Sequence, residues 1–184
     1  MRQIKSWKQH PVIHWVEVTD TDSGKIVGAA EWEIRREVSP SDEPMKPINA
    51  YWHIEGSEEK VFAEKLLMNL RGFMKERMIR PHIELEQLVV HPDHRRRGVG
   101  RLLISWGIQK SDELRLETCV ESVPFGVPIY ENCGFGNLEC LNPDMATSNP
   151  SEKWKEYMAD DLRVFFMWRP VGHDCRAGED GLLA

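Results

Sequence analysis

The stretch LEQLVVHPDHRRRGVGRLL, residues 85–103, decides the fold, because it runs from an apolar strand through a basic loop into a helix. Gly98 and Gly100 lack side chains where a ligand must approach backbone amides. The helix expected from Gly98 presents unpaired N–H groups and the positive end of its dipole. The stretch therefore predicts an anion-binding cradle, and a pyrophosphate fits it.

Other phosphate-binding or basic loops explain this stretch less well. A Walker loop ends in Gly-Lys-Ser or Gly-Lys-Thr, which is absent here. A dinucleotide fingerprint needs a small residue where Leu103 stands and a tight turn directly after the strand, whereas residues 91–97 intervene. A basic loop can also be solvated or bind nucleic acid. A net charge of -6 argues against nucleic acid as a partner.

Two motifs together resemble those of a known family. The pattern Arg95-x-x-Gly98-x-Gly100 after an apolar strand resembles the acyl-CoA signature of the GCN5-related N-acetyltransferase (GNAT) superfamily. Further along, Tyr130-Glu131-Asn132-Cys133-Gly134-Phe135 resembles the Tyr-x-x-x-Gly-Phe element that ends the fourth helix in many members. The resemblance implies an α/β fold with a mixed, mostly antiparallel sheet that splays at its two central parallel strands and is flanked by helices.

Length and composition favour one soluble globular domain. The chain has 184 residues, of which 41% are hydrophobic and 29% charged, and we expect a domain over residues 1–172 with a flexible tail over 173–184. No stretch is long enough to cross a bilayer, and the N-terminus lacks the apolar run of a secretory signal, so the sequence predicts a cytoplasmic protein without a membrane partner. Neither the four Cys nor the seven His show metal-ligand spacing, so no metal is expected.

The first half of the chain predicts a hairpin, an excursion and a helix. β-Favouring residues over 14–19 and 25–34 flank turn chemistry at 20–24. The polar, proline-containing stretch 35–56 predicts a long surface excursion with little regular structure. Apolar residues at helical spacing from Ser57 predict a helix that ends before Arg80-Pro81.

The second half predicts a β-α-β crossover. We expect a strand over 82–90, a helix over 98–109 and a strand over 115–120. A crossover of this kind makes its two strands parallel and places ligands beyond their carboxyl ends.

The C-terminal part is expected to hold one more helix and one more strand. Pro128 at the first helical position and Gly134 just past the last delimit a short helix around Tyr130. Residues 141–155 are expected to form a loop and 162–168 a closing strand. The tail from Gly172 is expected to fray.

One departure from the family concerns the N-terminus. Members usually have a strand and one or two helices before the first hairpin, which shape a wall of the acceptor pocket, whereas only residues 1–13 precede the first predicted strand here. Either a partner or residues 35–56 and the following helix replace that wall, or the chain is a shortened form. The resemblance therefore leaves two hypotheses: an acetyltransferase, or a catalytically weak CoA-binding or partner-binding module.

The resemblance also implies how the donor, acetyl-CoA, is held. Amides of the turn over residues 96–101 should bind the pyrophosphate, with arginine side chains adding charge-assisted contacts. Backbone groups of the strand before the turn should pair with pantetheine as an added strand does, and its amides should form a modest oxyanion site. The expected cofactor-binding residues are Leu88, Val89, Val90, Arg95, Arg96, Arg97, Gly98, Val99, Gly100 and Arg101.

An amine acceptor must lose a proton before it attacks. An alkylamine with a pKa of about 10.4 is neutral only about once in 2,500 molecules at pH 7, a handicap of roughly 4.6 kcal/mol. By resemblance, Glu84 or Glu86 is the base, directly or through water, and strand alternation places both on one face with His82. A strand glutamate can equally be solvated or ion-paired, and an arylamine needs no base.

The departing thiolate needs a donor. Tyr130 matches the family's usual donor position, and a phenol of pKa about 10 can give a proton or hydrogen bond to a thiolate whose conjugate acid lies near 8 to 9. Its ring can instead pack in the core with the hydroxyl on a backbone carbonyl. The sequence thus predicts an enzyme that transfers the acetyl group of acetyl-CoA to a primary amine of a small molecule or protein, by direct attack in a ternary complex. A second copy of the chain is a candidate partner.

Overall fold

The computed structural model describes residues 11–37 and 44–176, and the chain forms two compact units. The first unit comprises residues 1–38, 80–139 and 165–184, and the second comprises 39–79 and 140–164. The predicted N-terminal segment before residue 11 and part of the predicted excursion, residues 38–43, lie outside the described residues.

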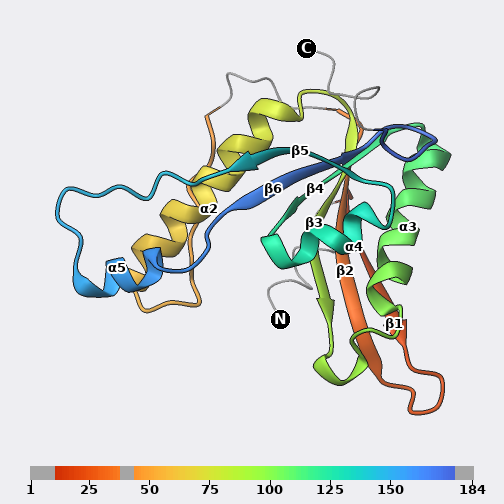
Figure 1. The fold of residues 1–184 in the computed structure, drawn as a ribbon, viewed down its shortest axis with the longest axis horizontal. Helices are drawn as coiled ribbons and strands as arrows, with labels where there is room; N and C mark the ends of the chain where they lie inside the picture. The colour runs from red at the N-terminus through yellow and green to blue at the C-terminus, as the bar shows by residue number, and fades with distance from the viewer. Residues whose placement is uncertain (1–10, 38–43, 177–184) are drawn as a thin grey trace. The chain divides into compact units, whose positions relative to one another are not determined.

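A six-stranded mixed sheet has the order β1-β2-β3-β4-β6-β5 (Figure 1). The β1–β2, β2–β3 and β4–β6 pairs are antiparallel, and β3 and β4 are parallel, as the predicted crossover requires. The strands are β1 Ile13–Thr19, β2 Ile26–Arg35, β3 His82–Val90, β4 Glu117–Ser122, β5 Gly136–Leu141 and β6 Val164–Arg169.

Helix α3, Val99–Leu114, is the crossover and packs on one face of the sheet. The prediction ended this helix at Gln109, but the helix continues to Leu114. Its C-cap is Arg115, whose backbone lies in the left-handed region with φ 55°. A Cβ added at Gly107 would lie 2.3 Å from the Trp32 ring, so a glycine is needed where α3 crosses β2. Buried residues of α3 and of strands β2, β3 and β4 form one core: Val27, Ala30, Trp32, Ile34, Ile83, Leu85, Val99, Leu103, Ile104 and Val120.

β3 carries a bulge in the middle of the sheet. Glu31 and Trp32 of β2 are consecutive, but they face Gln87 and Leu85, so Glu86 is an extra residue on β3. Leu85 is buried in the α3 core before the bulge, and Leu88 packs against the same core after it. The bulge therefore resets which side chains face α3.

The second unit is built around α2, Glu58–Arg77, and α5, Glu152–Met158. Each helix starts at a serine N-cap, Ser57 and Ser151, whose side chain accepts a hydrogen bond from a backbone N–H three residues on. The core of the second unit contains Phe62, Met145 and Trp154.

The structure corrects the predicted loop over residues 141–155 and shortens the predicted excursion over residues 35–56. The predicted loop over 141–155 is wrong at both ends, since β5 reaches Leu141 and α5 begins at Glu152. Within the predicted excursion, β2 extends to Arg35, and residues 44–56 hold no helix or strand.

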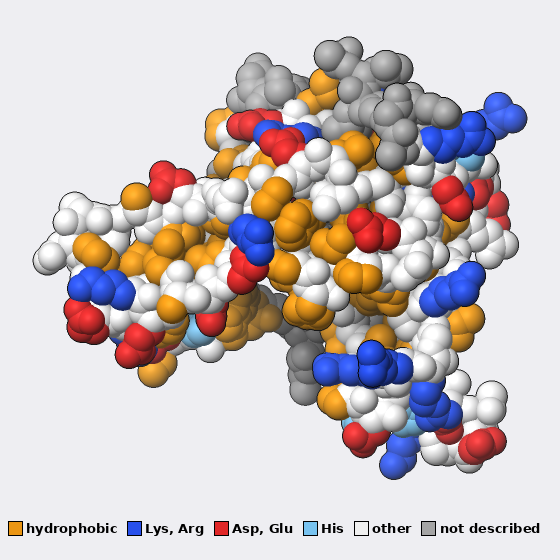
Figure 2. Space-filling model, in the orientation of Figure 1, with side chains coloured by type: hydrophobic (Ala, Val, Ile, Leu, Met, Phe, Trp, Pro, Cys, Tyr) orange, Lys and Arg blue, Asp and Glu red, His pale blue; other side chains and the backbone are white. Residues whose placement is uncertain are grey.

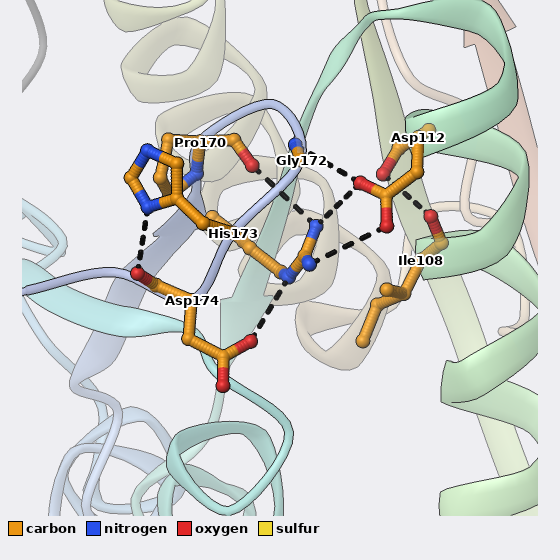
Figure 3. A network of polar contacts seen from close by, with 8 residues as sticks. Ile108, Asp112, Pro170, Gly172, His173 and Asp174 are labelled. Carbon is orange, nitrogen blue, oxygen red and sulfur yellow. Dashed lines mark hydrogen bonds and ion pairs between the residues drawn. The ribbon is translucent and has the colours of Figure 1, made fainter.

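A polar network fixes the end of β6 (Figure 3). The buried Arg169 places Nη1 2.9 Å from Oδ1 of Asp112 on α3 and Nε 3.5 Å from Oδ1 of Asp174. Asp112 also accepts a hydrogen bond from the Gly172 N–H at 3.0 Å, and the Cys175 N–H donates to the Gly134 carbonyl at 2.8 Å. The segment after Gly172, expected to fray, is thus held through these contacts, while residues 177–184 lie outside the described part.

Candidate active site

The two central strands separate within the first unit. β3 and β4 pair in parallel from His82 and Glu117 to Leu85 and Val120, and β3 then continues to Val90 without further pairing to β4. On its other edge β3 stays paired to β2 as far as Val90. Residues 88–90 therefore present one main-chain edge that pairs with no other described strand, as an extended ligand would require.

β3 leads into a turn with strained backbone and then into α3. A short 3₁₀ helix, Pro92–His94, is followed by Arg96 with φ 59° and Gly98 with φ 85°, and Gly98 is the N-cap of α3. A Cβ at Gly98 would meet nothing within 4 Å, so this position is open. The first amide of α3 that bonds to a described residue is that of Leu102, which donates to the Gly98 carbonyl at 3.0 Å. The preceding amides fit an anion.

Basic side chains surround this turn. Figure 2 shows Lys and Arg side chains gathered at the end of the unit where β3 leads into α3. Arg97 Nη1 lies 2.9 Å from His94 Nδ1, and its Nη2 lies 3.8 Å from Asp20 Oδ2, so this side chain is held across the turn. Four arginines of the turn and first helical turn are exposed: Arg95, Arg96, Arg97 and Arg101.

A glycine is required at position 100 for a different structural reason than at position 98. It is buried, and a Cβ there would lie 2.8 Å from Ile129 Cδ1 and 3.9 Å from Val90 Cγ2. This glycine lets α4, Val127–Glu131, lie against the start of α3 and the end of β3. The predicted start of α4 is one residue late, since Val127 precedes Pro128 in the helix.

Tyr130 therefore belongs to the helix that packs on the predicted cradle. Its ring is buried and meets Phe135 edge to face, with centroids 5.9 Å apart. Burial, with a smaller contribution from Cys133, raises the pKa of Tyr130 to about 12. The phenol is therefore a hydrogen-bond donor at neutral pH.

The sheet face opposite the α3 core is acidic. Arg35 of β2 contacts both Glu84 and Glu86, and His82 Nε2 lies 3.8 Å from Glu84 Oε2, so the structure brings these predicted residues together. Sequence reasoning missed further members of this face, although strand alternation in 25–34 could have found those on β2. The missed residues are Glu31, Glu33 and Arg35 on β2 and Cys119 and Glu121 on β4.

Two carboxyl groups on this face have raised pKa values. Burial, with the charges of Glu84 and Glu33, raises the pKa of Glu86 to about 8, although Arg35 opposes the rise. Burial, with Glu84 and Glu86, likewise raises the pKa of Glu121 to about 8, and its Oε1 is buried without a hydrogen-bond partner in the described part. Glu86 can therefore release or accept a proton near neutral pH.

The chain belongs to the acetyltransferase (GNAT) family, whose model matches residues 2–135. The fold is similar to three solved acetyltransferases. Naa20 from Chaetomium thermophilum, in complex with a bisubstrate analogue, has a TM-score of 0.55 and 15% identity, covering 97% of this chain and 79% of that chain. A structure from Corynebacterium glutamicum described as histone acetyltransferase HPA2 and related acetyltransferase has a TM-score of 0.51 and 16% identity, covering 95% of this chain and 74% of that chain.

The third is the ribosomal-protein-S18-alanine N-acetyltransferase from Escherichia coli, with a TM-score of 0.50 and 16% identity, covering 100% of this chain and 83% of that chain. No curated protein matches the chain. No helix within the described residues has the length and apolar character needed to span a membrane. No three His, Cys, Asp or Glu residues in the described part are grouped as metal ligands.

Proposed function

We propose that the protein transfers the acetyl group of acetyl-CoA to a primary amine of a small molecule or a protein, by direct attack in a ternary complex. The observation that carries this proposal is the open edge of β3, which runs directly into an arginine-rich turn and the start of α3. The strand edge suits pantetheine and the turn suits the diphosphate, so one continuous surface fits a CoA molecule.

In this proposal, different residues of the turn and of β3 contact different parts of acetyl-CoA. The amides of Val99, Gly100 and Arg101 face the diphosphate in this proposal, and Gly98 leaves the space open. The exposed guanidinium groups of Arg95 and Arg96 add charge-assisted hydrogen bonds to phosphate oxygens. Main-chain groups of residues 88–90 bind pantetheine, and an amide among them stabilises the developing oxyanion.

Glu86 is the better candidate for the base of the two predicted glutamates. Its pKa of about 8 lies close to operating pH, where a base combines adequate ionisation with adequate proton affinity. In the reaction, the amine nitrogen forms a bond to the acetyl carbon, the carbon–sulfur bond breaks, and the proton of the amine passes to Glu86 directly or through water. The sulfur departs as a thiolate and takes a proton from water, while Glu86 returns its proton to solvent, so that CoA is released as a thiol.

Tyr130 serves the sulfur as a hydrogen-bond donor. With a pKa of about 12, the phenol is a weaker acid than a thiol of pKa about 8 to 9, so complete transfer of its proton would be uphill. A hydrogen bond to the sulfur stabilises the charge that develops there without requiring this transfer. The cytoplasmic location, the single domain over residues 1–172 and a homodimer stay predictions from the sequence.

The test measures binding and turnover separately. Acetyl-CoA should raise the melting temperature of the protein, and a thiol reagent should detect CoA release in the presence of polyamines, arylamines, amino acids or peptides. Gly98→Asp places a carboxylate in the open cradle and should abolish the thermal stabilisation. Gly24→Asp, at another open glycine with positive φ, is the matched control.

Each outcome separates the two hypotheses. Stabilisation by acetyl-CoA with no release above the background for any acceptor would favour a CoA-binding module instead. No stabilisation of the wild type, or equal stabilisation of wild type and Gly98→Asp, would contradict the cradle itself.

A further inference from the structure

Arg35, the last residue of β2, bridges carboxylates from two strands. Its Nη2 lies 2.5 Å from Glu33 Oε2 and 3.5 Å from Glu86 Oε1, and its Nε lies 3.3 Å from Glu84 Oε2. No other Lys or Arg of the described residues forms an ion pair with these three glutamates. One guanidinium thus serves three carboxylates.

The three contacts are unequal. Glu33 and Glu84 have side chains 17% and 12% exposed and lie closer to Arg35, whereas Glu86 is 36% exposed and has the longest contact. Three ionised carboxylates beside one guanidinium would leave two uncompensated negative charges in a half-buried site, which favours a proton on one of them. Glu86 is the most weakly held and the most accessible of the three.

We infer that Arg35 is a positioning residue, which holds Glu33 and Glu84 as fixed carboxylates and leaves Glu86 as the group that exchanges the acceptor's proton. This inference rests on the proposed function for its consequence in catalysis, but not for the arrangement of charges. The bulge supports it, because the extra residue in β3 re-aims Glu86 relative to Glu84.

The charges around Glu86 set the sign of the effect. Its pKa is raised by burial, Glu84, Glu33 and Glu31, and lowered by Arg35. Removing the guanidinium should therefore raise the pKa of Glu86 further, because the neighbouring carboxylates then act without opposition. The titratable and charged groups that face it within the first unit are Glu31, Glu33 and Arg35 on β2, His82 and Glu84 on β3, and Cys119 and Glu121 on β4.

The first experiment is an NMR titration of side-chain carboxyl carbons in protein labelled at glutamate, with Glu86 assigned from the Glu86→Gln variant. Arg35→Gln should move the titration of Glu86 upward by about one pH unit or more. Arg35→Lys keeps a positive charge but cannot bridge both strands, so it should give a smaller rise. Arg36→Gln removes the same charge from the exposed neighbouring residue and should leave Glu86 unchanged.

The second experiment measures kcat/KM as a function of pH, with an amine acceptor identified in the CoA-release assay. The acid limb of Arg35→Gln should move upward with Glu86 and cost roughly tenfold in rate at pH 7. A purely structural role would lower the melting temperature and leave the midpoint of this limb in place.

The outcomes keep the two proposals apart. A wild type that releases no CoA with any amine contradicts the proposed function, while the NMR titration still decides the role of Arg35. Unchanged titration of Glu86 in Arg35→Gln, or in Arg35→Lys should the first variant not fold, overturns the inference. Titration of Glu84 in place of Glu86 near neutral pH also overturns it.

Discussion

At the scale of single residues, the site depends on how local contacts distinguish two neighbouring glutamates. Glu84 and Glu86 are of one type and stand two positions apart, yet Glu84 has the shorter contact with Arg35 and lies 3.8 Å from His82. Glu86 occupies the bulge, is more exposed, and has a pKa raised to about 8. Two residues of the same type thus differ in their contacts and exposure because of the local geometry of β3.

Glu86→Gln removes the base in the proposed mechanism. We expect kcat/KM for an alkylamine to fall by about 10²–10⁴-fold, the usual contribution of general base catalysis. For an arylamine the loss should be small, because that nucleophile is already neutral at pH 7. Rates of CoA release with one acceptor of each kind check this, and equal losses for both acceptors would mean that Glu86 acts in some other way.

Tyr130→Phe removes the hydroxyl while keeping the ring that packs against Phe135. We expect kcat to fall by at least tenfold, with little change in the dissociation constant of acetyl-CoA, because the hydrogen bond forms as charge develops on sulfur. Tyr157→Phe, whose ring packs on Phe62 in the other unit, is the control and should retain full turnover. Full turnover of the Tyr130 variant would exclude the residue from the mechanism.

At the scale of elements, α3 is positioned beside the arginine-rich turn because its glycines fit specific neighbours. Gly107 admits the Trp32 ring of β2, and Gly100 admits Ile129 of α4. Both contacts are on the face of α3 that packs in the core, whereas Gly98 faces open space. The same residue type therefore permits close packing at two positions and leaves open space at the third, where the proposed function places the diphosphate.

Gly107→Ala should lower the free energy of unfolding by about 1–3 kcal/mol, because the added methyl group overlaps the buried Trp32 ring. Gly72→Ala in α2 should act oppositely and stabilise by about 0.4–1 kcal/mol, since its Cβ would make an ordinary 3.4 Å contact with Met45 Cε. Urea denaturation of both variants measures the difference. A Gly107 variant as stable as the wild type would show that the helix shifts at no cost.

The elements also show what the sequence can predict. The crossover from β3 through α3 to β4 was predictable because each element has a clear apolar period and the glycine-rich turn separates them. β5 was missed because none of its residues is fully buried, and α5 because it is only 7 residues long. The contacts of Arg35 with Glu33, Glu84 and Glu86 depend on strand register and on a bulge, neither of which leaves a signal in alternation alone.

At the scale of the whole molecule, two regions of the first unit gather charges of opposite sign. The chain carries a net charge of -6, yet arginines gather at the turn before α3, while glutamates gather on the sheet face opposite the α3 core. In the proposed function the donor is anionic and the acceptor is an amine, so each would meet charge of the opposite sign. The carboxylate face also has a consequence for folding, because crowded carboxylates oppose their own ionisation.

The stability of the protein should therefore fall as pH rises from about 5 to 9. Glu121 has a pKa of about 8 in the folded protein and an ordinary value of 4.5, so the folded state binds more protons across this range. The contribution of Glu121 to stability is therefore fully present below its pKa in the unfolded chain, and it is lost as the pH rises through its pKa in the folded protein. Glu121→Gln needs no ionisation, so its melting temperature relative to the wild type should rise by a few degrees between pH 5 and pH 9. Glu17→Gln, at an exposed position of β1, should show no such trend, and parallel curves for Glu121→Gln and the wild type would place the Glu121 carboxylate in water.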